Sequence, residues 1–397
     1  MTPSDEDRDG FRARVRAWLD EHAPAKGSPD DFSNVHVVSA STIEEYEAGE
    51  RRALEVTRAW QRKLHEAGFA GRSWPVEYGG HGAPAWQDDV IAEEQARYGV
   101  STKLFAVALD MLPPVLFAHG THEQRAAHLP AVAAGAEGWC QLLSEPDAGS
   151  DLGNVKTTAT AVDGGWSVSG QKVWTSGAGA SAWALLIARS ERDVPGRDGL
   201  SCFAMAMYQP GVTVRPLRQL SGAYHFNEVF LDDAFVSTAG LTGELGGGMA
   251  VLRTMLASER ASIGGGTSAR GAGALVALVR EVGRSDDPVV RQQVVSAVVR
   301  ERMLDLVQAR AAATGAVPAA GSVCKLLYSE HARITASAAL EVLGSRGVLH
   351  GDPVSAPWLD RFLFAPGLRL GGGTDEIQRN TIAERGLGLP REPKPRP

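Results

Sequence analysis

The stretch that decides the fold is Trp139-Cys-Gln-Leu-Leu-Ser-Glu-Pro-Asp-Ala-Gly-Ser-Asp151, which joins an expected strand to a tight loop. Pro146 presets one turn angle, Asp147 favours a turn, and Gly149 permits a positive φ. Such a loop exposes backbone N–H groups and two hydroxyl groups, which could hold a pyrophosphate or the edge of a flat ring. Taken alone, the stretch is more often a plain surface turn.

A second informative stretch, Gly170-Gln-Lys-Val-Trp-Thr-Ser176, is predicted to be a strand. Because side chains alternate along a strand, we expect Lys172, Trp174 and Ser176 to share one face. A tryptophan and a hydroxyl on one face could stack on, and hydrogen-bond to, a flat heteroaromatic ring. The same strand is also compatible with ordinary core packing.

Outward from these stretches, the sequence divides into three regions by its hydrophobic pattern. Residues 1–138 have helical periodicity, whereas residues 139–238 contain short strand-like runs and the hairpin signal Asp163-Gly164-Gly165. Residues 239–397 are helical again. The sequence therefore predicts three domains in the order helical, β, helical.

The bulk composition indicates a folded protein without nucleic-acid, zinc or membrane features. The chain has 397 residues and a formal net charge of −7, which disfavours a DNA or RNA partner. Three widely spaced cysteines, Cys140, Cys202 and Cys324, suggest buried free thiols rather than disulfides or metal ligands. The acidic N-terminus is unlike a secretory signal, and no apolar run is long enough to span a membrane. We expect a cytoplasmic protein.

Together, Ser144 to Asp151 and Gly170 to Trp174 resemble the signature of acyl-CoA dehydrogenases. Similar segments follow the family order over most of the chain: Trp74-Pro75-x-Glu77-Tyr78-Gly79-Gly80, Glu93-Glu94, His119-Gly120-Thr121-x-x-Gln124, Gly373 to Asn380, and Ala383-Glu384-Arg385. The resemblance implies an α-helical N-terminal domain over residues 1–138, a middle β-domain over 139–238 and a C-terminal four-helix bundle over 239–397.

The resemblance also implies FAD as cofactor, bound between the β-domain and the bundle and completed by a neighbouring subunit. An arginine that the family usually sends to the neighbour's FAD has no good match, since the spacing of Arg280 and Arg284 differs. No metal ligands are expected. By position, the implied cofactor residues are Gln141, Leu143, Ser144, Gly149, Ser150, Trp174, Ser176, Glu341, Gly344, Thr374 and Glu376, and the implied substrate residues are Ser150, Arg260 and Gly372.

The catalytic base of the family reaction is absent from the position where many members carry it. Family chemistry removes a proton next to a thioester carbonyl while a hydride leaves for flavin N5, so a carboxylate is needed in a water-poor site. Many members carry it in the closing motif, where this chain has Leu370-Gly-Gly-Gly-Thr374 with Gly372 at the glutamate position. The resemblance still implies that the backbone N–H at this position donates to the thioester oxygen.

Glu259, on another helix, is the candidate for the catalytic base that the closing motif lacks. Glu259 follows Met255 by four residues and Leu256 by three, which places it on the apolar face of the helix predicted for residues 248–263. Burial raises the pKa of a carboxyl, as a general base requires. A minority of family members place the base at this position, followed by an arginine that Arg260 matches. The alternative is an interhelical salt bridge.

Other polar groups fit structural roles better. His225 and His81 are expected in loops, Asp232-Asp233 and Glu93-Glu94 on solvated faces or caps, and the glycine runs at 246–248 and 264–266 at helix ends. The proline-rich tail over residues 390–397 is expected to be mobile.

The sequence thus predicts an FAD-dependent acyl-CoA dehydrogenase with Glu259 as base and an electron-transfer flavoprotein as electron acceptor. We expect a homodimer or homotetramer. Two alternatives stay open: a desaturase of acyl groups held on a carrier protein, and a non-catalytic subunit of a mixed oligomer. The length and branching of the acyl group are not predicted.

Overall fold

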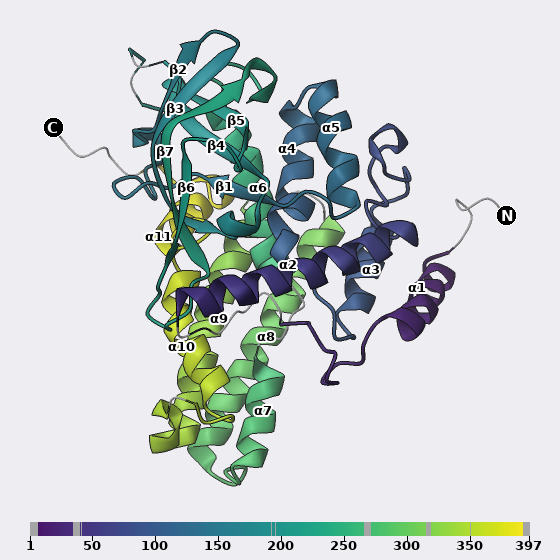
Figure 1. Cartoon of the computed structure of the whole chain (residues 1–397). Helices are drawn as coiled ribbons and strands as arrows, with labels where there is room; N and C mark the ends of the chain where they lie inside the picture. The colour runs from purple at the N-terminus through teal and green to yellow at the C-terminus, as the bar shows by residue number, and fades with distance from the viewer. Residues whose placement is uncertain are drawn as a thin grey trace. The chain divides into compact units, whose positions relative to one another are not determined.

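The computed structural model describes residues 7–34, 40, 42–191, 193–194, 196–265, 271–314, 319–349 and 351–391 (Figure 1). Contacts divide the chain into two units, residues 1–258 and 259–397. Over the described ranges, no helix has the length and apolarity needed to cross a membrane. The tail beyond residue 391 lies outside the described residues, so the expectation of mobility there stays a prediction.

Helices form the first half of unit 1, as their hydrophobic pattern predicts. Helix α1 buries Phe11, Val15 and Leu19 on one stripe, and Asp7 caps its N-terminus by accepting a hydrogen bond from the Gly10 N–H. Helix α5 begins with a capping box between Thr121 and Gln124. The helices of this half are α1 (Arg8–His22), α2 (Ile43–Glu66), α3 (Trp86–Gln95), α4 (Leu112–His119) and α5 (His122–Ala133).

A buried ion pair between α1 and α3 corrects one expectation. Glu94 was expected on a solvated face or cap, but its side chain is 1% exposed and pairs with Arg12 at 2.7 Å and Arg16 at 2.9 Å. The expectation is wrong for Glu94 because α1 packs on α3 and covers it. Glu93 does remain partly exposed and also pairs with Arg12.

An eight-stranded sheet follows the helices, with the strand order β6-β7-β3-β2-β4-β5-β8 and β1 paired to β4. The predicted hairpin is confirmed, since β2 and β3 are antiparallel and Val162 is opposite Gly165. The strands are β1 (Trp139–Leu142), β2 (Thr158–Val162), β3 (Gly165–Ser176), β4 (Trp183–Arg189), β5 (Leu200–Ala206), β6 (Val212–Leu217), β7 (Phe226–Ser237) and β8 (Leu241–Thr242).

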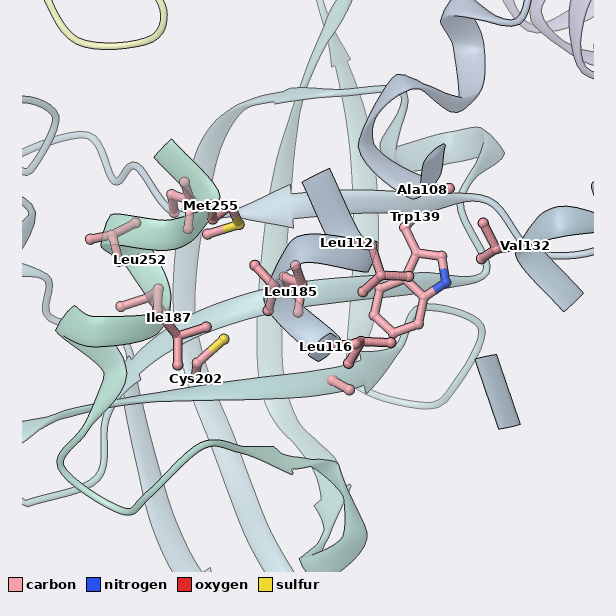
Figure 2. Packing of buried hydrophobic residues seen from close by; sticks show 14 of the residues in the cluster. Ala108, Leu112, Leu116, Val132, Trp139, Leu185, Ile187, Cys202, Leu252 and Met255 are labelled. Carbon is pink, nitrogen blue, oxygen red and sulfur yellow. The ribbon is translucent and has the colours of Figure 1, made fainter. Parts of the chain in front are cut away.

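One hydrophobic core joins α4 and α5 to the sheet. Figure 2 shows Trp139 of β1 beside Leu112 and Leu116 of α4, with Leu185 of the neighbouring strand close by. Leu252 and Met255 of helix α6 (Gly248–Gly265) belong to the same cluster. This packing fixes the first half of α6 against the sheet. The division between the two units falls within α6, at residue 259.

Unit 2 is helical and has its own core. Leu275, Ala297, Ala339 and Trp358, from four different helices, belong to one buried cluster. Its helices are α7 (Ala272–Glu281), α8 (Pro288–Thr314), α9 (Ala320–Leu343), α10 (Ala356–Leu368) and α11 (Asp375–Thr381). The predicted order of helical, β and helical regions is therefore confirmed. Cys140 and Cys202 are buried free thiols, as expected, and Cys324 is buried as well.

Candidate cofactor surface and candidate base

The loop after β1 lies directly beside the end of β3. The backbone N–H of Val173 donates to the carbonyl of Ser144 at 2.9 Å. The Lys172 ammonium donates to the carbonyl of Leu143 at 3.0 Å. These two bonds bring together the two sequence stretches from which the cofactor site was predicted.

A buried ion pair holds this loop in shape. Lys172 Nζ lies 2.9 Å from Glu145 Oε1, and the two side chains are 0% and 5% exposed. Glu145 also accepts hydrogen bonds from the backbone N–H groups of Lys156 at 2.5 Å and Thr157 at 2.9 Å. Burial alone would raise the pKa of Glu145, but Lys172 and the backbone donors outweigh it and lower that pKa. Sequence reasoning missed this pair, although a lysine in the middle of a predicted strand was a signal for it.

The predicted alternation along β3 is wrong at Trp174. Lys172 is fully buried, whereas Trp174 is 61% exposed, so the two do not share a face. Trp174 has φ = 63° and lies where the pairing with β7 shifts register between Lys172 and Thr175. This bulge changes the direction of the following side chains. Trp174 and Ser176 remain exposed together, and Trp174 contacts the Phe226 ring edge-on at 5.9 Å.

Five residues of this region, four exposed and Ser144 partly buried, form what we call the flavin surface: Ser144, Gly149, Ser150, Trp174 and Ser176. Within the described parts of the chain, no hydrogen bond involves the hydroxyl groups of Ser144, Ser150 or Ser176. Gly149 does not adopt the positive φ that a glycine permits. A Cβ there would meet nothing within 4 Å, so its backbone is open to a ligand. An exposed indole with hydroxyl and backbone donors nearby fits a flat, hydrogen-bonding ring system such as a flavin.

Two further predicted cofactor residues lie closer to the core. Leu143 is buried and contributes its carbonyl to Lys172. Gln141 is partly buried in β1, and its amide donates to the sulfur of Met111 at 3.0 Å. Leu143 therefore supports the loop through its backbone carbonyl, whereas the Gln141 side chain contacts Met111.

The predicted base, Glu259, lies near Gly372, the residue at the position where many family members carry the glutamate. The Gly372 N–H is close enough to the Glu259 carboxylate to lower its pKa. Burial raises the pKa of Glu259, and the opposing effects of Arg260, the Gly372 N–H and Lys325 are smaller. The pKa of Arg260 is lowered by burial, against the effect of Glu259. Glu259 and Gly372, separated by more than a hundred residues in the sequence, thus meet within unit 2.

A second buried ion pair anchors the loop that contains Gly372. Asp375 accepts hydrogen bonds from Lys325 at 3.1 Å, Ser329 at 2.9 Å and Arg369 at 2.7 Å. The Gln378 amide donates to the carbonyls of Gly372 at 2.8 Å and Gly373 at 3.1 Å. Sequence reasoning treated Asp375 and Gln378 only as letters of the closing motif and missed both roles.

The residues predicted for the adenosine half of FAD form two groups within unit 2. Thr374 caps the N-terminus of α11, and the exposed Glu376 pairs with Arg379. Glu341 and Gly344 lie at the C-terminal end of α9. Because Asp375 contacts Ser329, and residue 341 is twelve residues further along α9, the groups are separated by about 18 Å along the helix. A single copy does not bring them together.

Neither arginine considered for a neighbour's FAD has a clear cofactor role here. Arg284 donates to the carbonyls of Glu341 and Val342, both at 3.1 Å, and so caps the end of α9. Arg280 is exposed in the last turn of α7. The side chain of Arg284 is therefore already hydrogen-bonded to carbonyls of its own chain.

Comparison with known proteins gives consistent matches over the chain. Family models match residues 5–136 (acyl-CoA dehydrogenase, N-terminal domain), 140–234 (middle domain) and 246–387 (C-terminal domain). The acyl-CoA dehydrogenase IpdE1 of Mycobacterium tuberculosis is 36% identical over 397 residues, covering 98% of this chain and 100% of that protein.

Two solved structures share the fold. The "Tcur3481-Tcur3483 steroid ACAD" has a TM-score of 0.79 and 24% identity, covering 98% of this chain and 99% of that one. The ChsE4-ChsE5 complex from Mycobacterium tuberculosis has a TM-score of 0.75 and 24% identity, covering 99% of this chain and 100% of that one.

Proposed function

The chain belongs to the acyl-CoA dehydrogenase family, and on this premise we propose that Glu259 is the base of a flavin-dependent α,β-dehydrogenation of an acyl-CoA thioester. Glu259 takes the α-proton, and Ser150, Arg260 and Gly372 contact the substrate. The observation that carries the proposal is that the Gly372 N–H lies close enough to the Glu259 carboxylate to lower its pKa. It supports the view that a carboxylate from α6 reaches the place of the closing-motif glutamate.

The environment of Glu259 suits proton abstraction from a weak carbon acid. Burial raises its pKa, so the carboxylate becomes a stronger base. The nearby positive charges of Arg260 and Lys325 act against the effect of burial and favour its ionised form. The Gly372 N–H is also the donor expected at the thioester oxygen, where negative charge develops as the proton leaves.

The family depends on FAD, and the donor set of this chain fits that cofactor. When bound, FAD supplies the oxidant that receives the hydride. We propose that the flavin surface holds the ring system and that Gln141 and Leu143 support it from below. The adenosine half is assigned to Thr374 and Glu376 of one copy and to Glu341 and Gly344 of a neighbouring copy.

The proposed role of Glu259 predicts that Glu259→Gln retains FAD and loses turnover. The variant should purify yellow, because it leaves the flavin surface unchanged, and acyl-CoA should fail to bleach it anaerobically. We expect a loss in the rate of flavin reduction of about a thousandfold or more, since the base is removed. Stopped-flow absorbance with a panel of acyl-CoAs measures this. Glu281→Gln, an exposed carboxylate at the end of α7, is the matched control. Full reduction by Glu259→Gln would exclude the assignment.

The same measurement shows whether the acyl group is carried by CoA or by a carrier protein. If acyl-CoA reduces the bound flavin and acyl-carrier protein does not, the result supports the proposal. The reverse result favours the carrier-protein desaturase. An electron-transfer flavoprotein is the proposed electron acceptor. Its reduction after substrate addition can be followed directly.

The absence of a carboxylate at Gly372 favours a second candidate, a non-catalytic subunit of a mixed oligomer. Under this alternative, the chain purified alone would lack both FAD and activity until a related subunit is co-expressed. FAD content per chain, measured by absorbance after denaturation, separates the two candidates. Stoichiometric FAD with substrate-dependent bleaching in the single chain would exclude the second.

A further inference from the structure

Trp174 has a backbone conformation that a tryptophan adopts only under constraint. Its φ of 63° lies in the left-handed region, where a bulky side chain crowds its own backbone and where a β-bulge commonly places a glycine. A strained conformation of this kind persists only when the surrounding contacts hold it, and it is frequent at ligand sites. The contacts on either side of Trp174 must therefore maintain it.

The bulge is the reason why this tryptophan reaches solvent. Lys172 of β3 pairs with Val229 of β7. The next pair joins Thr175 to Asn227, so three steps along β3 match only two steps along β7. The extra residue separates Trp174, which is 61% exposed, from the buried face to which Lys172 belongs. The exposure of the indole thus depends on the persistence of the bulge.

One side of the bulge is held by the loop after β1. The Val173 N–H donates to the Ser144 carbonyl at 2.9 Å, so it is directed toward this loop and not toward β7. The residue before it, Lys172, is fixed to the same loop by two buried hydrogen bonds of its ammonium group. The backbone that precedes Trp174 is therefore tied to the loop that carries the other residues of the flavin surface.

The other side of the bulge is held by a single buried side chain of β7. Asn227 is 1% exposed, and its Nδ2 atom donates to the Thr175 carbonyl at 3.0 Å. Loss of this donor would leave a buried carbonyl without the bond, which is costly away from water. The Thr175 hydroxyl, in contrast, is buried without a hydrogen-bond partner among the described residues. The backbone after Trp174 is thus fastened through the Thr175 carbonyl and not through the Thr175 side chain.

We propose that Asn227 is a positioning residue for the flavin ring system: it holds the bulge so that the Trp174 indole and the Ser176 hydroxyl stay exposed together. This inference rests on the proposed function, because it assumes that the flavin surface binds the ring. Asn227 acts only through the backbone of Thr175, which lies between these two residues. Without the amide, the strained Trp174 backbone relaxes toward an extended conformation, in which its side chain turns to the face of Lys172.

The test uses the full chain with Asn227→Leu, which keeps the bulk of the side chain and removes the amide. Hydrogen–deuterium exchange should become faster in a peptide covering residues 172–177. We expect the Kd for FAD to rise about tenfold, since one net hydrogen bond that holds the surface is lost. The visible circular dichroism of the bound flavin should also change, because it reports the arrangement of groups around the ring. A purely structural role would lower the Tm and leave this dichroism and the Kd unchanged.

Two substitutions at the same place provide matched controls. Thr175→Val removes the hydroxyl that has no partner among the described residues and keeps the carbonyl that Asn227 binds, so it should leave all three measurements unchanged. Glu228→Gln alters the residue next to Asn227 on β7, whose carboxylate accepts a hydrogen bond from Gln171 at 2.9 Å. It controls for a general change in the pairing of β3 with β7.

Each outcome decides one part of the inference. Unchanged exchange at residues 172–177 in Asn227→Leu would overturn the role of Asn227 in holding the bulge. Faster exchange with unchanged FAD affinity and visible dichroism would overturn its link to the flavin. Asn227→Ala gives the same comparison with a smaller side chain, and failure of both variants to fold would overturn the positioning role in favour of a core role.

Failure of the proposed function gives different results. An unsubstituted chain that binds no FAD would overturn the flavin surface and, with it, the role of Asn227 toward the ring. Full flavin reduction by Glu259→Gln would overturn the assignment of the base alone. Neither result alters the exchange comparison at the bulge, which is made on the protein without substrate.

Discussion

A lysine without exposed surface contacts the loop that carries three of the five residues of the flavin surface. Lys172 pairs with Glu145 at 2.9 Å, and the carboxylate is bound in addition by two backbone N–H groups. Such a pair contributes little compared with a well-packed apolar pair, but removal of one partner leaves an uncompensated buried charge. Lys172 therefore specifies the shape of the loop more than it adds to overall stability.

Replacement of this lysine should be strongly destabilising. Lys172→Met leaves the Glu145 carboxylate buried without its partner, so we expect the free energy of unfolding to fall by about 3 kcal/mol or more. Urea denaturation followed by circular dichroism measures the change. Lys156→Met removes a partner of Asp147 whose side chains are both 74% exposed, and it should leave stability unchanged. Equal effects from the two substitutions would contradict the argument.

At the scale of elements, ion pairs as well as apolar contacts hold the N-terminal helix α1 against α3. Glu94 of α3 accepts hydrogen bonds from Arg12 and Arg16 of α1, and the Arg16 and Arg12 bonds lower its pKa against the effect of burial. The carboxylate therefore stabilises the docking of α1 at pH values above its ordinary pKa of 4.5. This contribution is lost as the pH falls below that value through the lowered native pKa.

Glu94→Gln should weaken the docking of α1 in a pH-dependent way. We expect a loss of about 1–2 kcal/mol at pH 7, reduced from a fully buried pair because both arginines are partly exposed to solvent. The difference from the unsubstituted protein should shrink as the pH falls below 4.5, where the native carboxylate becomes protonated. Thermal unfolding between pH 3 and pH 7 checks both statements. A difference that stayed constant over this range would count against a role for the charge.

At the scale of the whole molecule, one chain supplies the proposed adenosine-binding residues in two separated places. Thr374 and Glu376 lie at the start of α11, and Glu341 and Gly344 lie at the far end of α9. A closed symmetric oligomer lets each copy supply what the other lacks. FAD binding and subunit association should therefore be linked.

This linkage predicts that, when the protein is diluted, the oligomer dissociates and its bound FAD is released at the same protein concentration. A ligand that binds only the assembled form stabilises it by mass action, so added FAD should shift the association midpoint to lower protein concentration. Flavin fluorescence and sedimentation velocity, measured over the same dilution series, should give coincident transitions. A monomer that retains stoichiometric FAD would show that one copy is sufficient to bind the cofactor.

Much of this architecture was predictable from the sequence, because it depends on local chemistry. The apolar stripe of α1, the Asp163-Gly164-Gly165 turn and the long helices of the C-terminal region follow from hydrophobic periods and turn residues. The place of Glu259 on the apolar side of its helix follows in the same way. Hydrophobic periodicity alone, however, does not tell which distant residue a side chain meets.

The remaining features were decided only by tertiary packing. The bulge at Trp174 arises where β3 shifts register against β7, and this reverses the alternation expected for an isolated strand. Glu94 is buried because α1 covers it. The Gly372 N–H and the Glu259 carboxylate come from residues far apart in the chain, and Asp375 and Gln378 hold the loop that carries this N–H. The sequence by itself determined which residues were available for the chemistry, and the tertiary structure decided their partners, because long-range contacts and burial are properties of the folded chain.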